Sequence, residues 1–326
     1  MKKFLTLALC IVIVMSTVLV GCGETDTGAA NVKFGAGVYV GTPTVTDATE
    51  DKDGSGKIDV TVAAVTVDAD GKIVACQLDT ASNTVSFTAD GKAIANESFK
   101  TKYELGADYN MVAYGGAVKE WFEQADAFEA VVAGKTLDEV KALVAEGAKG
   151  TEEVINAGCT ITISDFVAAI EKAYNAAAAE VSADAALKVS IATEQTIADV
   201  TEDKDGSNKV SVNIFAAAID ADGKALAASS DCVEVTFTFN AEGVSTLDTA
   251  KAVVSKREQG ANYGMVAYGG AAKEWFEQAD AFDAACIGKT AAEIAGLMGE
   301  DGKGTSDLQT AGCTIYVTGF VKAATK

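Results

Sequence analysis

The chain has 326 residues, carries a formal net charge of −21 and contains no histidine. A surface this acidic repels nucleic acid and anionic membranes, so we expect no nucleic-acid partner. Without histidine the chain has no Ser-His or Cys-His nucleophile pair and lacks the common ligand of haem, zinc and copper sites.

The N-terminus has the layout of a secretory signal. Two lysines precede an apolar run (4–20), which ends in Leu-Val-Gly before Cys22. This order is typical of a signal peptide, and the small residue before the cysteine resembles a bacterial lipobox. We therefore expect a lipoprotein signal peptide (1–21), a lipid on Cys22 that anchors the protein to the outer face of the cytoplasmic membrane at the cell surface, and a tether (22–33). A plain signal peptide or an anchor helix is the alternative.

Strand patterns open the first half of the chain. A strand is predicted over 37–46. Residues 58–62 alternate apolar and polar side chains, as in a half-buried strand, and Val65 and Val67 extend it. Asp70-Gly71 predicts a hairpin turn. A return strand then begins at 72–75, and 85–88 predicts another strand.

Helical patterns follow the strands. Trp121, Ala125, Phe128 and Val132 recur on one face of a helix. Thr136 with Glu139 forms a capping-box signature for a second helix. A last helix follows Ser164 and extends toward the middle of the chain. Strands followed by helices predict an α+β fold with a mainly antiparallel sheet packed with helices.

The second half repeats the first. Residues 263–290 match 109–136 at 22 of 28 positions with an offset of 154, and TEDKDGS recurs at 49–55 and 201–207 with an offset of 152. A period this long exceeds that of solenoid repeats. It predicts two tandem homologous domains, 34–176 and 186–326, joined by a linker over 177–185.

Two other features predict no metal or redox site. The turn DKDGSGKI (51–58) begins like a calcium loop, but Val62 and, in the second copy, Ile214 stand where a calcium loop needs its bidentate glutamate, so we expect polar turns. The five cysteines after Cys22 are odd in number and form no CxxC, which does not suggest a disulfide framework.

Two matched segments are candidates for ligand binding. The loop AYGGA allows close backbone approach and places aromatic and methionine side chains where they suit a flat ring; alternatively it is only a turn into a core helix. The turn AGCT before a helix suits an anion, or is a strand that ends at a cap. The cofactor-binding candidates are Met111, Tyr114, Gly158 and Thr160, and their counterparts Met265, Tyr268, Gly312 and Thr314.

Each half resembles the FMN-binding domain of extracytoplasmic flavoproteins, in the duplicated lipoprotein form found in Gram-positive bacteria. The resemblance is carried by the strand Gly37-Val38-Tyr39-Val40-Gly41, by the hairpin within 58–74, and by AGCT at the place of the family's S/T-G-A-T motif. In that family the last threonine of the motif can carry FMN through a phosphoester. The resemblance implies FMN as the cofactor, and a membrane electron donor and a flavin transferase as partners.

The family motif is altered here in both copies. Ala157 and Ala311 replace its first residue, and Cys159 and Cys313 replace its alanine. These departures argue against covalent attachment and leave non-covalent flavin or another planar ligand. Because both copies depart alike, they predict two equivalent sites. Two functions follow as hypotheses: a surface-anchored flavin electron carrier, or a non-catalytic ligand-binding or interaction lipoprotein that kept the fold and lost the flavin. No catalytic residue is assigned.

Overall fold

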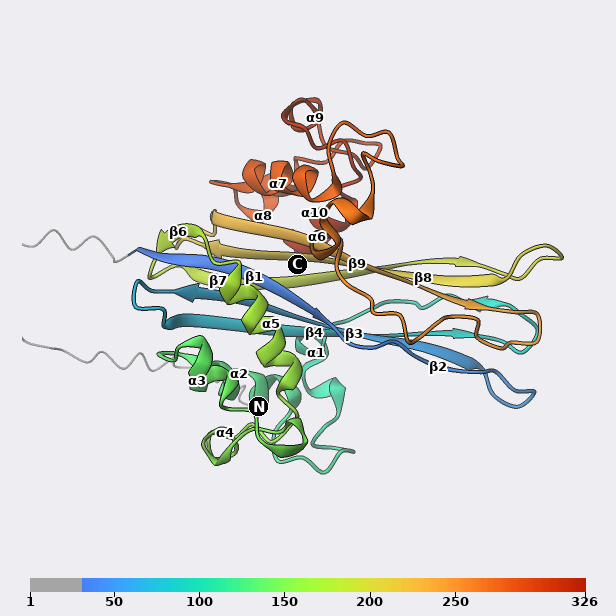
Figure 1. The fold of residues 1–326 in the computed structure, drawn as a ribbon, viewed down its shortest axis with the longest axis horizontal. Helices are drawn as coiled ribbons and strands as arrows, with labels where there is room; N and C mark the ends of the chain where they lie inside the picture. Colours follow the sequence, from blue (N-terminus) through green and yellow to red (C-terminus); the bar gives the residue numbers. More distant parts are fainter. Residues whose placement is uncertain (1–30) are drawn as a thin grey trace, which may run out of the picture.

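The protein consists of two antiparallel sheets that pack face to face, with helices on the outer side of each (Figure 1). The computed structural model describes residues 31–326, so the expected signal peptide and Cys22 lie outside the described residues. Mixed helices and antiparallel sheets agree with the predicted α+β class. We call residues 31–182 the first half and 183–326 the second half.

The first sheet has the order β5-β4-β3-β1-β6, with β2 paired to β3, and the second has the order β7-β8-β9. The strands are β1 (Asn31–Val40), β2 (Thr44–Thr46), β3 (Gly54–Val67), β4 (Ile73–Phe87), β5 (Ala93–Ile94), β6 (Ala179–Ser182), β7 (Ala186–Ala198), β8 (Gly206–Ile219) and β9 (Ala225–Phe239).

The helices follow in two matched series. In the first half they are α1 (Lys102–Leu105), α2 (Trp121–Val132), α3 (Leu137–Lys141), α4 (Glu152–Ala157) and α5 (Ser164–Asn175), and in the second α6 (Lys256–Gln259), α7 (Trp275–Cys286), α8 (Ala291–Ala295), α9 (Ser306–Ala311) and α10 (Thr318–Ala324). Short 3-10 turns lie at Gly106–Tyr109, Glu146–Ala148 and Gly260–Tyr263. Within 31–326, none of these helices has the length and apolar content that crossing a bilayer requires.

Strand β3 alternates apolar and polar residues over 58–62 and is mainly apolar over 62–67. Ile58, Val60 and Val62 point into the core between the two sheets, whereas Val65 and Val67 point into the core beneath the helices of the first half. Its C-terminal part is buried on both faces and not half-buried as expected, and burial on both faces selects apolar residues at most positions.

Three expectations about boundaries differ from the structure. The strands expected at 72–75 and 85–88 form the two ends of one strand, β4 (Ile73–Phe87). Its polar middle pairs continuously with β3, and the Thr61 and Thr80 hydroxyls hydrogen-bond at 3.0 Å. Strand β1 already begins at Asn31, inside the expected tether. Strand β6 lies inside the expected linker and pairs with β1, so this segment is an edge strand of the first sheet.

The helix predictions are confirmed where the signal is local. Helices α2 and α7 bury the expected face, and α3 and α8 each begin with a complete capping box, at Thr136 and Thr290. Helix α5 begins at Ser164 but ends at Asn175, earlier than expected. It lies directly on β1 because Gly37 has no side chain: a Cβ there would come within 2.3 Å of the Ala173 backbone.

Candidate functional site

The two AGCT turns have the same geometry. Helix α4 ends at Gly158 with φ of 107°, and α9 ends at Gly312 with φ of 109°, a left-handed conformation that favours glycine. The threonine two residues later, Thr160 or Thr314, is exposed in each half. The candidate anion-binding glycines and threonines therefore lie together in each turn.

A buried glutamine, which the sequence patterns do not predict, accepts hydrogen bonds from each turn. The backbone N–H and the hydroxyl of Thr160 both donate to Oε1 of Gln124, at 2.8 and 3.0 Å, and Thr314 makes the same two bonds to Gln278 at 2.9 and 2.8 Å. Both glutamines are 1% exposed and lie on α2 and α7. Their signal was the identity of KEWFEQ in the two copies, which the apolar face of the helix does not explain.

A lysine lies over each turn. Lys119 Nζ is 3.5 Å from the carbonyl oxygen of Ala157, and Lys273 Nζ is 3.4 Å from that of Ala311. A Cβ on Gly312 would come within 2.1 Å of Lys273 Nζ, so the lysine side chain lies directly against the glycine. The exposed threonine hydroxyl is thus accompanied by a positive charge, which favours an anion.

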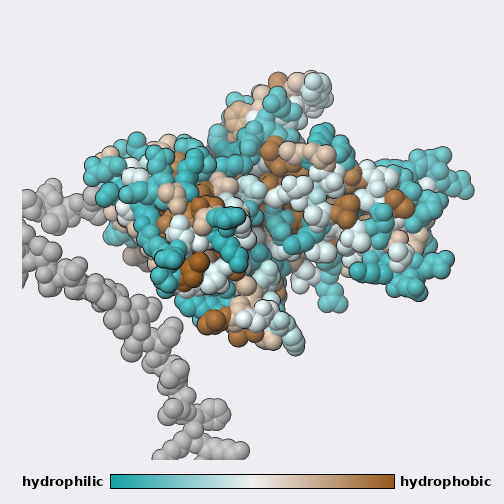
Figure 2. All heavy atoms as spheres, turned by 60° about the horizontal axis from the view of Figure 1, so that its bottom comes forward, coloured by the Kyte–Doolittle hydropathy of each residue, from teal (hydrophilic) through white to brown (hydrophobic). Residues whose placement is uncertain are grey.

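The YGG loops present their tyrosines to solvent. Tyr114 is 87% exposed and Tyr268 is 92% exposed, whereas Met111 and Met265 pack against the cores beneath the helices. The face of the molecule drawn in Figure 2 carries scattered hydrophobic residues among hydrophilic and intermediate ones. The candidate residues of each loop therefore lie in different places: the methionines contact the core, and the tyrosines extend into solvent.

In the second half, Met265 and Thr314 line a common cleft of about 500 Å³. We call this the second-half cleft. It lies between the outer face of β8 and β9 and the helical layer, and Tyr268 is not among its lining residues. Its aromatic walls are Tyr263, Trp275, Tyr316 and Phe320.

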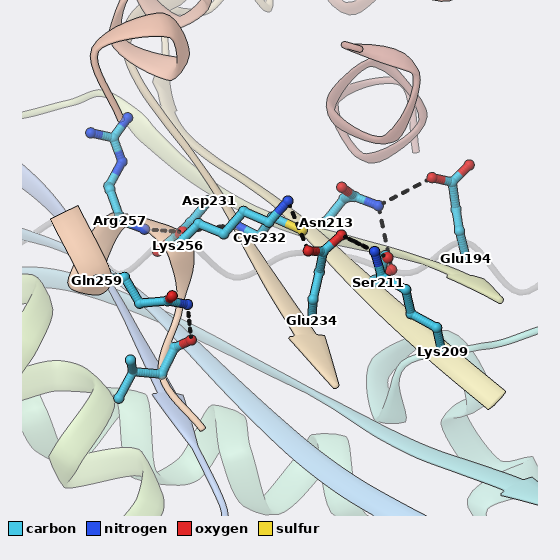
Figure 3. Close-up of polar contacts among 11 residues, drawn as sticks. Glu194, Lys209, Ser211, Asn213, Asp231, Cys232, Glu234, Lys256, Arg257 and Gln259 are labelled. Atoms are coloured by element: carbon cyan, nitrogen blue, oxygen red, sulfur yellow. Dashed lines mark hydrogen bonds and ion pairs between the residues drawn. The ribbon is translucent and has the colours of Figure 1, made fainter. Parts of the chain in front are cut away.

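An ion network forms the charged side of this cleft (Figure 3). Glu234 Oε2 is 3.1 Å from Lys256 Nζ, and its Oε1 is 2.7 Å from Lys209 Nζ. The Lys256 ammonium also lies 4.9 Å from the ring centre of Tyr263 and 5.5 Å from that of Trp275. This is a cation–π arrangement within a largely buried environment.

Burial and pairing act in opposite directions on these two charges. Burial favours neutral Lys256, but Cys232, Tyr263 and Glu234 outweigh it and raise the pKa of the lysine. Burial likewise raises the pKa of Glu234, but Lys209 and Lys256 outweigh it and hold that pKa below its usual range. Both groups are therefore charged at neutral pH, and the cleft keeps a fixed dipole beside its aromatic wall.

Amide and hydroxyl groups also line the second-half cleft, on the side formed by the sheet. The Asn213 amide nitrogen donates to Glu194 Oε2 at 3.4 Å (Figure 3). It also donates to the backbone oxygen of Ala192 at 3.3 Å, and the Ser211 hydroxyl donates to Glu234 at 3.3 Å. The cleft therefore combines flat apolar walls with donors, acceptors and one buried cation, as small-molecule sites do.

The first half keeps part of this arrangement. Lys102 Nζ lies 5.3 Å from the ring centres of both Tyr109 and Trp121. Ser82 stands at the position of Glu234, however, so this lysine lacks the matching carboxylate. The predicted equivalence of the two sites therefore holds for the turn and the aromatic pair and fails for the charged network.

No family model, curated protein or solved structure matches this chain. Within the described residues, no group of three or more cysteine, aspartate or glutamate side chains is placed to hold a metal ion. The five cysteines in this part of the chain are all unpaired, and burial raises the pKa of Cys232, which lines the cleft, to about 12. Such a thiol is a poor nucleophile at neutral pH.

Proposed function

We propose that the protein is a flavin-binding electron carrier that holds FMN in the second-half cleft and is attached to the cell surface through a lipid on Cys22. It carries electrons from a membrane donor to extracellular acceptors. The observation that carries this proposal is the cleft itself: about 500 Å³, walled by aromatic rings, with a buried cation inside and Thr314 at its edge. Its volume lies within the range of small-molecule sites, about 300–1,000 Å³.

The residues present fit the chemistry of FMN. Tyr263 and Trp275 suit the flat ring, and the Thr314 hydroxyl with the nearby Lys273 ammonium suits the phosphate. Bound flavin supplies the redox chemistry, and the protein supplies position and electrostatics. Because the Thr314 hydroxyl already donates to buried Gln278, we propose non-covalent binding.

We also propose that the chain comprises two tandem homologous domains, 34–176 and 186–326. The support is the repetition of elements: each half has a long hairpin, a helix that begins at a matched tryptophan, a capped short helix and a glycine-terminated helix before the last one. The segment between them, 177–185, contains β6.

A second function has one observation in its favour. Both threonine hydroxyls of the altered motif are bonded to buried glutamines, as in a turn kept for structural reasons. A lipoprotein that binds a different planar ligand, or that serves only in interactions, would retain this turn without flavin.

The test is a titration of the purified mature protein with FMN, followed by flavin absorbance and tryptophan fluorescence, together with the intact mass. We expect saturable binding and no covalent mass increment. Thr314→Ala weakens binding, and the matched Thr160→Ala does not. A protein that neither carries flavin when co-produced with a flavin transferase nor binds added FMN would exclude the carrier and leave the second function.

A further inference from the structure

The two halves have different residues at one position of their sheets, and the pairing of the strands shows that this position is the same in both. In the first sheet Tyr39 of β1 pairs with Thr61 of β3, and in the second Ala192 of β7 pairs with Asn213 of β8. Thr61 and Asn213 are related by the offset of 152 that aligns this part of the repeat. A tyrosine in the first half therefore occupies the sheet position that an alanine occupies in the second.

The side chains at this position face the helical layers. Tyr39 is half-buried and packs against the core that contains Trp121 and Phe166. Ala192 belongs to the second-half core, which contains Trp275 and Phe320, two walls of the cleft. The tyrosine ring thus projects toward the region of the first half that corresponds to the second-half cleft.

A second difference accompanies the first. Asp165, at the start of α5, corresponds to Gly319 in α10. Burial raises the pKa of the Tyr39 phenol, and the negative charge of Asp165 adds to this effect. In the second half a Cβ on Gly319 would come within 2.2 Å of the Asn213 amide carbon, so this position needs glycine while Asn213 is present.

We infer that Tyr39 and Asp165 close the first-half counterpart of the cleft, so that the chain has one ligand site although its sequence is duplicated. The first half is then a structural partner whose sheet supports the second. The identity of the ligand as flavin rests on the proposed function; the closure of the first half does not.

The two tryptophans of the chain allow a test without any ligand, because Trp121 lies in the first half and Trp275 in the second. Trp275→Phe leaves Trp121 as the only reporter, and Trp121→Phe leaves Trp275. Quenching by acrylamide is measured for each. Both indoles are almost fully buried, with Trp121 3% and Trp275 4% exposed, so their quenching in the unsubstituted sheet background should be similar. We expect quenching of Trp121 to rise when Tyr39→Ala and Asp165→Gly are added.

A reciprocal set of substitutions provides a second test, which can be used if the first variant does not fold. Ala192→Tyr, Asn213→Thr and Gly319→Asp copy the first half into the second, and we expect them to reduce quenching of Trp275. Circular dichroism and thermal unfolding verify the fold of each protein. If neither set of substitutions changes the quenching of its tryptophan, the inference is overturned.

Flavin stoichiometry gives an independent measurement. We expect one FMN per wild-type chain, two after Tyr39→Ala with Asp165→Gly, and none after the reciprocal changes. Two FMN per wild-type chain would refute the closure. If no protein binds FMN, the proposed function fails, and the tryptophan measurement still decides whether the first half is closed.

Discussion

The rings of Phe87 and Phe239 stack at a centroid distance of 4.4 Å with 4° between their planes. Phe87 ends β4 and Phe239 ends β9, and the offset of 152 aligns them in the repeat. Each residue therefore contacts its own counterpart, which is characteristic of isologous packing. Gly54 and Gly206 lie beneath the rings, where a Cβ would come within 2.3 Å of them.

We predict that Phe87→Ala and Phe239→Ala each lower the free energy of unfolding by about 3–5 kcal/mol, because both rings are fully buried and their removal leaves a cavity. The double variant costs less than the sum, since the two truncations share that cavity. Urea denaturation measures these values. As a control, Tyr268→Ser, at an exposed site, changes stability by less than about 0.5 kcal/mol. Additive losses would show that the rings act independently.

The features that the sequence predicted correctly depend on neighbouring residues. The turns at Gly71 and Gly223 have φ of 77° and 76°, as Asp-Gly hairpins require, and the capping boxes of α3 and α8 involve residues three apart. The apolar face of α2 is likewise encoded within one helix. These local preferences agree with the overall fold, so the structure keeps the turns, caps and helix faces that they predict.

The features that were missed depend on distant contacts. Gln124 reaches Thr160 across 36 residues, and the pairing of β6 with β1 joins segments about 150 residues apart. The difference between Tyr39 and Ala192 is visible in the sequence, but its meaning depends on the register of two separate sheets. Local propensity and periodicity contain no information on these contacts.

Two carboxyl groups of the first half, buried Asp79 and half-buried Glu129, have raised pKa values. Burial raises the pKa of Glu129 to about 8, with Asp126 and Asp79 adding to the effect, and burial raises the pKa of Asp79 to about 7. The unfolded chain releases these protons near pH 4. Because the folded protein holds the protons to higher pH, its stability falls as pH rises from about 4 to about 8.

Glu129→Gln is therefore predicted to flatten this pH dependence and to raise stability at pH 8 relative to the wild type. The amide oxygen can still accept the Leu78 N–H bond, which Glu129 Oε1 accepts at 2.7 Å. Urea denaturation between pH 5 and pH 8 provides the measurement. A wild-type stability that rises steadily over this range would contradict the prediction.

The second half neutralises the corresponding acids with an arginine. Arg257 contacts Asp280 at 2.6 Å and Asp283 at 2.7 Å, and Tyr103 stands at its position in the first half. We predict that Arg257→Leu costs about 3–5 kcal/mol at neutral pH, because it leaves a buried carboxylate unpaired. Adding Asp283→Asn recovers part of the loss. Equal stability of Arg257→Leu and wild type at pH 7 would rule out this role for the arginine.

The glutamines beneath the two turns separate a structural role from a ligand-binding role. Gln124→Leu and Gln278→Leu each remove the acceptor for a backbone N–H and a threonine hydroxyl, so both should lower stability by a similar amount, about 1–3 kcal/mol.

Only Gln278 orients a threonine that lines the second-half cleft. FMN affinity, measured by titration at a temperature where both variants are folded, should therefore fall in Gln278→Leu and stay at the wild-type value in Gln124→Leu. The first-half variant is a matched control, because it suffers the same loss of hydrogen bonds in a turn of the same geometry. A parallel loss of affinity in both variants would mean that the turn acts through global stability, and the assignment of Thr314 to the phosphate end of the ligand would have to be withdrawn.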